Sequence, residues 1–159
     1  MNEGGPLEPV ENYLPQLKTV FESCGVVLAY LYGSQATGTA GPLSDVDIAV
    51  LFGDEIPEEQ RFDEVLRLHG ELARFFSRDD VNVVDLARGT PLLNNEIRLH
   101  GIVLYCKTDD MRVEFEIRAL QKFLDTAPLR RELNKYLAQR IRRGLFGKPI
   151  PLRPAGTAR

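Results

Sequence analysis

Two short groups of residues in this sequence combine the residue types that bind metal-bound phosphates. Gly33-Ser34 joins a residue that lets the backbone approach closely to a hydroxyl, and ten residues separate this pair from the two carboxylates of Asp45-Val46-Asp47. Aspartates two positions apart on a strand face the same way, with Cα atoms roughly 6–7 Å apart, which suits two divalent cations about 3.5–4 Å apart. We therefore predict that Asp45 and Asp47 bind two Mg²⁺ ions carrying a nucleoside triphosphate, whose phosphates contact Gly33 and Ser34.

A two-metal site needs a further carboxylate, and Asp85 is the candidate because it ends the apolar run Val81-Asn82-Val83-Val84 on a neighbouring predicted strand. Without cations, crowded carboxylates repel one another, whereas bound magnesium allows all of them to ionise. The alternative for Asp85 is a strand-end residue that caps a turn, and for Asp45 an ordinary turn aspartate. Asp47, inside an apolar strand, has no comparable structural explanation.

Three other motifs that bind phosphates or metals fail on this segment. A P-loop needs a lysine where Thr39 stands. The dinucleotide-binding fingerprint needs two glycines separated by one residue, and Ser34-Gln35 breaks this pattern. A calcium loop needs further oxygen ligands just after Asp47, where the chain instead enters an apolar strand. The metal-triphosphate interpretation is what remains.

The elements that position these residues follow from the hydrophobic pattern, in which apolar runs and alternation predict strands and helical spacing predicts helices. The expected strands are 26–32, 45–52, 81–86 and 102–106. The expected helices are 8–24, a segment from Pro57 to Phe76, 91–100, 115–124, a last piece from Pro128 to Ile141, and a short helix after Gly33-Ser34. The alternation predicts an α/β (α+β) fold with a helical C-terminus.

The length and the charge distribution limit the possible functions. The 159 residues are enough for one buried core, so we predict one domain over residues 10–146 with flexible tails at 1–9 and 148–159.

The two parts of the chain differ in charge. Residues 1–129 hold 11 basic against 22 acidic side chains, a balance of −11, whereas residues 130–159 hold 9 against 1, a balance of +8. The acidic body argues against direct nucleic-acid binding. The basic end suits either an acidic partner or a solvated helix.

No segment approaches the roughly 18 apolar residues that cross a membrane, and the N-terminal residues lack the pattern of a secretion signal. We therefore expect a cytoplasmic protein without membrane contact. Cys24 and Cys106 stand far apart with no partner at ligand spacing, which predicts buried reduced thiols rather than a disulfide or a zinc site.

The motif at residues 33–47 resembles the signature of the DNA polymerase beta-like nucleotidyltransferase superfamily. Residues 10–143 as a whole resemble its minimal nucleotidyltransferase (MNT) branch, which includes the antitoxins of HEPN/MNT toxin–antitoxin pairs, and the stretch Val113-Glu114-Phe115-Glu116-Ile117-Arg118-Ala119 is similar in character to that antitoxin branch. The resemblance implies a nucleotidyltransferase fold with a small mixed sheet of about four strands flanked by helices.

The resemblance also implies an activity: transfer of AMP from ATP, with release of pyrophosphate, to a tyrosine of a partner HEPN RNase toxin. Asp45 and Asp47 would bind both magnesium ions, Asp85 would bind the catalytic one and help to deprotonate the acceptor, and Gly33 with Ser34 would hold the terminal phosphates. An oligomer with the toxin is expected.

Two alternatives to this function stay open. The acceptor is a small molecule such as an aminoglycoside in some relatives, although these normally carry a larger helical domain than the residues after 106 provide. A non-catalytic antitoxin, which neutralises its toxin by binding alone, is the other alternative. Mutation of Asp45 and Asp47 distinguishes the two functions, since a non-catalytic antitoxin should still neutralise its toxin and an enzyme should not.

Overall fold

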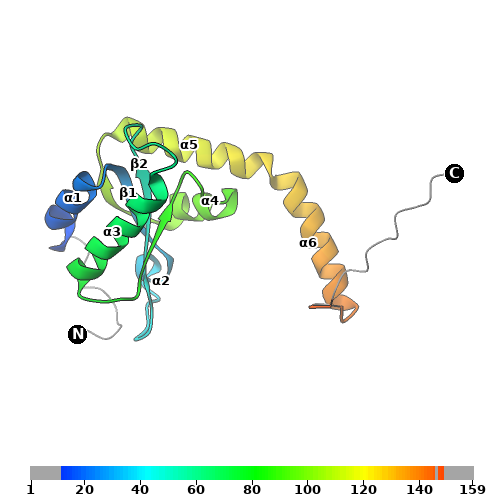
Figure 1. Cartoon of the computed structure of the whole chain (residues 1–159). Coiled ribbons are helices and arrows are strands. Elements are labelled where there is room, and N and C mark those ends of the chain that lie inside the picture. Colours follow the sequence, from blue (N-terminus) through cyan, green and yellow to red (C-terminus); the bar gives the residue numbers. More distant parts are fainter. Residues whose placement is uncertain (1–11, 146, 149–159) are drawn as a thin grey trace. The chain divides into compact units, whose positions relative to one another are not determined.

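The computed structural model describes residues 12–145 and 147–148 of the chain. Helices and strands follow one another in the predicted order, and all four predicted strands form (Figure 1). The helices are α1 (Leu14–Ser23), α2 (Gly33–Thr37), α3 (Arg61–Phe76), α4 (Pro91–His100), α5 (Asp109–Asp125) and α6 (Ala127–Arg142). The strands are β1 (Val26–Tyr32), β2 (Val46–Phe52), β3 (Val81–Asp85) and β4 (Ile102–Cys106).

The strands form one mixed sheet in the order β3-β2-β1-β4. β1 pairs antiparallel with β2 and β4, whereas β2 and β3 run parallel and are connected through α3. The almost entirely apolar sequence of β1 explains its central position, since a strand covered on both faces has no polar side to expose. The predicted mixed sheet of about four strands flanked by helices is confirmed.

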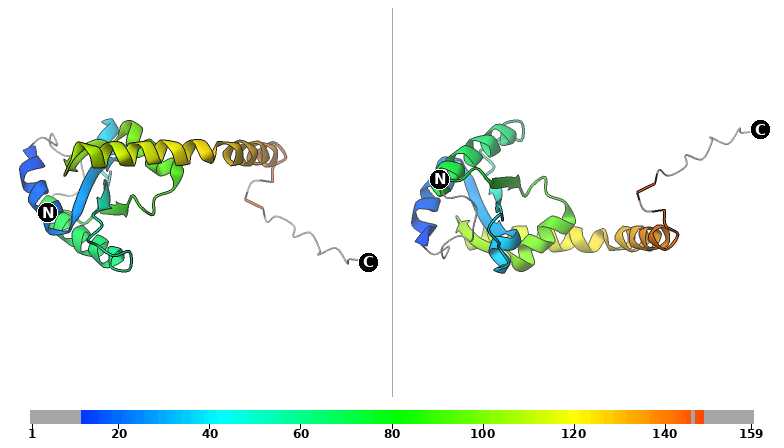
Figure 2. Two further views of the ribbon diagram at one scale, coloured as in Figure 1. Left: turned by 90° about the horizontal axis from the view of Figure 1, so that it is seen from above. Right: turned by 90° about the horizontal axis from the view of Figure 1, so that it is seen from below.

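Helices cover both faces of the sheet (Figure 2), and their buried residues belong to two hydrophobic clusters. On one face the buried helical residues come from α1 and α3, and they are Leu17, Phe21, Leu68 and Leu72. On the other face they come from α4 and α5, and they are Ile97, Phe115 and Ala119. Burial of a large apolar side chain contributes roughly 1.5–3 kcal/mol, so these helices hold the strands in a fixed arrangement.

Several element boundaries differ from the predicted ones, and α1 begins at Leu14 rather than at residue 8. β2 begins at Val46, so that Asp45 lies just before the strand. α3 begins at Arg61 rather than at Pro57, because residues 57–61 form tight turns in which the Gln60 N–H donates to the Pro57 carbonyl. α5 begins at Asp109, where the acidic first turn suits the positive end of the helix dipole.

The chain divides into two compact units, one up to Phe123 and the other from Leu124. The second unit contains α6, which has Pro128 in its first turn and buries none of its residues. Its large apolar side chains are exposed, and they are Leu129, Leu133, Tyr136, Leu137 and Ile141. The single domain predicted over residues 10–146 stays a prediction. The predicted tails, 1–9 and 148–159, lie outside the described residues except for Lys148.

Within residues 12–145 and 147–148, no helix is both long enough and apolar enough to span a bilayer. Cys24 and Cys106 are not bonded to each other; Cys24 is buried as predicted, whereas Cys106 is only half-buried, so the predicted burial is wrong for Cys106.

Candidate active site

The turn after β1 brings the two halves of the Gly-Ser and Asp-x-Asp motif into contact. Tyr32, the last residue of β1, is paired with Asp47 of β2. Gly33 follows with a φ of +70°, and a Cβ atom at this position would lie 2.6 Å from Asp47 Oδ2. Any other residue here would have a strained backbone and a Cβ atom that clashes with the Asp47 carboxylate. Only glycine therefore allows α2 to begin next to Asp47.

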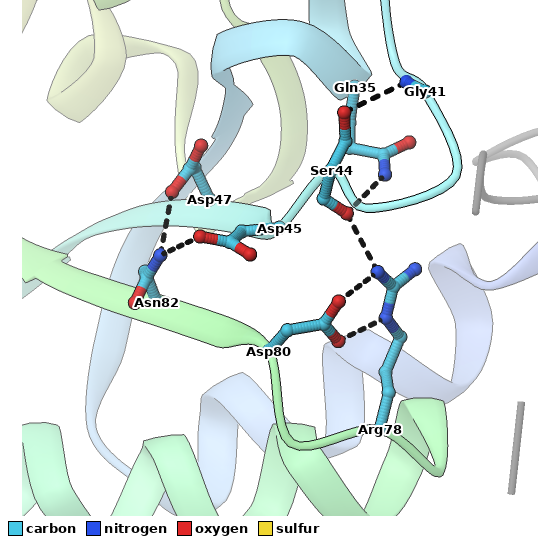
Figure 3. A network of polar contacts seen from close by, with 8 residues as sticks. All are labelled: Gln35, Gly41, Ser44, Asp45, Asp47, Arg78, Asp80 and Asn82. Carbon is cyan, nitrogen blue, oxygen red and sulfur yellow. Dashed lines mark hydrogen bonds and ion pairs between the residues drawn. The ribbon is translucent and has the colours of Figure 1, made fainter. Parts of the chain in front are cut away.

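Asp45, Asp47 and Asn82 form a polar cluster at one end of the sheet (Figure 3). Asn82 is paired with Asp47 in the parallel register of β2 and β3, so the two side chains share a face of the sheet. Asn82 Nδ2 donates to Asp47 Oδ1 over 3.1 Å and to Asp45 Oδ2 over 3.3 Å. Asp45 and Asn82 are exposed and Asp47 is half-buried, so the cluster is open to a ligand.

The structure does not bring Asp85 to this cluster. Asp85 is paired with Val50 of β2, three residues beyond Asn82, and an odd number of residues along a strand leads to the opposite face. Its side chain is buried, with 8% exposed, and Asp85 Oδ1 accepts a hydrogen bond of 2.9 Å from the Ala87 N–H. Asp85 therefore holds the turn after β3, which was the alternative interpretation, and Asn82 is the residue of β3 that faces Asp45 and Asp47.

The oxygen atoms of this cluster suit a divalent cation, but the cluster does not contain the three carboxylates that the sequence predicted. Among the described residues, no three Asp, Glu, His or Cys side chains are grouped so that they could hold a metal ion. Asp45 and Asp47 supply carboxylate oxygens, the ligands that Mg²⁺ prefers, and the Asn82 amide adds an oxygen when it is turned by half a rotation. The cluster consists of two carboxylates and one neutral amide.

Arg78 fixes the loop that carries Asp45. Its side chain is 6% exposed, and its guanidinium donates from Nη2 to the Ser44 carbonyl over 2.8 Å and from Nε to Asp80 Oδ1 over 2.6 Å (Figure 3). The Val46 N–H donates to the Asp80 carbonyl over 2.9 Å, which ties the start of β2 to the residue before β3. The hydrogen bonds from Arg78 hold the pKa of Asp80 below its ordinary value. Arg78 thus links Ser44, which precedes Asp45, to Asp80, which precedes β3.

A cavity lies beside Gly33 and Ser34. It has a volume of about 280 Å³ and is lined by Tyr32, Gly33, Ser34, Thr37, Thr39, Glu96, Ile97, His100 and Gly101. Burial and, to a lesser degree, the nearby Asp47 carboxylate raise the pKa of the Tyr32 phenol, which keeps it neutral. Gly33 and Ser34 therefore line a cavity with polar groups.

Sequence reasoning missed Asn82 and Arg78 as site residues. Asn82 interrupts an apolar run in the same way as Asp47 interrupts its strand, and this shared signal could have identified it. Arg78 lies in a polar segment between α3 and β3, where nothing in the sequence distinguishes it from a solvated arginine.

This fold and this site define a class of protein. Residues 15–110 match the family model described as polymerase beta, nucleotidyltransferase, and the chain belongs to this family. Within the family, it is homologous to the protein adenylyltransferase MntA of Shewanella oneidensis, with 28% identity over 110 residues that make up 69% of each chain.

Solved structures of toxin–antitoxin complexes have the same fold. A chain in the crystal structure of a toxin–antitoxin with AMP-PNP is matched with a TM-score of 0.66 and 23% identity, over 79% of this chain and 98% of that one. A chain in the structure of a tri-AMPylated Shewanella oneidensis HEPN toxin in complex with an MNT antitoxin is matched with a TM-score of 0.60 and 20% identity, over 82% of this chain and 99% of that one. The predicted nucleotidyltransferase fold is confirmed.

Proposed function

We propose that this protein is a protein adenylyltransferase that acts as an antitoxin: it transfers AMP from ATP to a tyrosine of a cognate HEPN RNase toxin and thereby silences the toxin. The contact of Gly33 with Asp47 carries the proposal, because it joins the phosphate-binding turn to the carboxylates of the nucleotidyltransferase motif. The homology to a protein adenylyltransferase supports the protein acceptor.

Each residue of the site has a role in this proposal. Asp45 and Asp47 hold Mg²⁺, which offsets the charge of the triphosphate when it is bound. Gly33 allows the backbone to approach the terminal phosphates, and Ser34 offers them its hydroxyl and its N–H. The proposal assigns Asp85 no direct role, since it faces away from the cluster.

The chemical step is a displacement at the α-phosphorus. The tyrosine oxygen forms a bond to this phosphorus, the bond between the α-phosphorus and the oxygen that bridges to the β-phosphate breaks, and pyrophosphate leaves. The phenolic proton passes to solvent. The protein accelerates this step mainly by holding the acceptor and the triphosphate in line. We assign the reaction to the cytoplasm, where ATP and the RNA targets of an RNase toxin are found.

A labelling experiment tests the proposed function. The full chain, ATP labelled at the α-phosphate, MgCl₂ and the cognate HEPN toxin are combined, and the toxin is analysed for label and for added mass. We expect transfer of one or more AMP groups to a toxin tyrosine. We expect Asp47→Asn to lower the rate by at least about 10²-fold, since it removes a carboxylate from the site. The exposed Asp79→Asn is the matched control and should react normally.

The same experiment distinguishes the alternatives. An unlabelled toxin in the presence of the intact chain would contradict the proposed function. Label on an aminoglycoside or a similar small alcohol, with none on the toxin, would identify the chain as a small-molecule nucleotidyltransferase.

A further inference from the structure

Asn82 lies next to Asp45 and Asp47, at the position where a two-metal centre needs a third carboxylate. It is paired with Asp47 across the parallel strands, and its amide lies within hydrogen-bond distance of both site carboxylates. Of the β3 residues, Asn82 alone makes these contacts, because Val81 and Val83 lie on the other face and Asp85 holds the next turn.

An amide and a carboxylate act differently at the position of the Asn82 side chain. The Asn82 Nδ2 group offers two N–H donors, and in the metal-free protein it holds Asp45 and Asp47 together by donating to both. An aspartate here would add a third negative charge within about 4 Å of the other two, where like charges repel one another. The amide therefore gives a site that keeps its shape without a cation.

We propose that Asn82 is the third ligand of the magnesium site and that its neutral amide weakens this site relative to one with three carboxylates. The inference rests on the proposed function. With a cation bound, the Asn82 amide would offer its Oδ1 as a ligand, and the protein ligands would contribute two negative charges instead of three. Cation affinity in oxygen-ligand sites follows the number of charged ligands, so Asn82 makes occupancy of this site sensitive to the concentration of free Mg²⁺.

The test measures binding of Mn²⁺ alone to the full chain, from the electron paramagnetic resonance signal of the unbound ion. Asn82→Asp should bind Mn²⁺ about tenfold more tightly than the natural chain, and Asn82→Ala about threefold more weakly, because these changes add a charged ligand or remove a ligand. Gln121→Glu, which makes the same amide-to-carboxylate change on the exposed side of α5, is the matched control and should leave the Mn²⁺ affinity unchanged.

Thermal unfolding separates a ligand from a merely structural residue. In EDTA, Asn82→Asp should unfold at a lower temperature than the natural chain, since three carboxylates repel one another. In saturating Mn²⁺, the order of the two unfolding temperatures should reverse. A structural amide would instead give the same destabilisation in both solutions.

The outcomes distinguish this inference from the proposed function. If Mn²⁺ binding depends on Asp47 but is equal in the natural chain, Asn82→Asp and Asn82→Ala, the role of Asn82 is overturned and the proposed metal site stands. If Asp47→Asn and the natural chain bind Mn²⁺ equally, the proposed metal site fails together with the inference.

Discussion

At the scale of single residues, Gly33 connects backbone conformation to the chemistry of the site. Gly33→Ala should lower the transfer rate by at least about 10²-fold, because the new Cβ pushes the Asp47 carboxylate away from its position. It should also lower the free energy of unfolding by about 1–2 kcal/mol through backbone strain. The label-transfer assay and urea denaturation measure the two effects.

Gly38 is the matched control for Gly33. It has nearly the same φ, +71°, but a Cβ on Gly38 would meet nothing within 4 Å. Gly38→Ala should therefore lose a similar amount of stability and keep most of its activity. Equal losses of activity in the two variants would show that the strain, and not the contact with Asp47, inactivates the enzyme.

The ion pair of Asp80 with Arg78 should make the free energy of unfolding depend on pH. Its pKa is lowered by Arg78, so ionised Asp80 stabilises the fold above the ordinary value of 3.8, and this contribution is lost as the pH falls through the lowered pKa. Asp80→Asn should lower the free energy of unfolding by about 1 kcal/mol at pH 7, since Asp80 is partly exposed. Urea denaturation should show the difference between the two proteins shrinking below pH 3.8. A difference that stays constant into acid would contradict this role of the carboxylate.

At the scale of secondary-structure elements, the sequence predicted the strands and helices well but not the register between β2 and β3. Hydrophobic patterning identifies a strand and its faces because it depends only on neighbours along the chain. Which residue of β3 lies opposite Asp47 depends instead on how α3 and its connections place the strand. The prediction of Asp85 used its residue type and its place at the end of an apolar run on a neighbouring strand, whereas the parallel register pairs Asn82 with Asp47. The buried contacts of Arg78 are equally a product of tertiary structure.

The helices differ in how much stability they contribute through apolar residues. Leu72 of α3 is fully buried, whereas Leu133 of α6 is 50% exposed. Leu72→Ala should lower the free energy of unfolding by about 2–5 kcal/mol, because it leaves a cavity in a packed core. Leu133→Ala should change it by no more than about 0.5 kcal/mol. Urea denaturation followed by circular dichroism compares the two, and equal losses would contradict an exposed α6 in the isolated chain.

At the scale of the whole molecule, antitoxin activity can be separated into catalysis and binding. The Asp45→Asn, Asp47→Asn double variant, produced together with the toxin, should fail to restore cell growth while still copurifying with the toxin, because in the proposed function the transfer of AMP, and not binding alone, silences the RNase. Asp109→Asn, Asp110→Asn is the matched control, as both residues are exposed at the start of α5. Full rescue of growth by the first variant would support neutralisation by binding alone.

The placement of Asp45 and Asn82 at the starts of two parallel strands affects how this protein can change in evolution. β2 has seven residues and therefore extends roughly 20 Å, so the connection at residues 53–60 lies far from the carboxylates. Insertions at that far end are tolerated more readily than changes in the turn at Gly33, because they leave the strand starts in place. Lineages of such enzymes can thus acquire new surface loops there, and with them new specificities, while their chemistry is inherited intact.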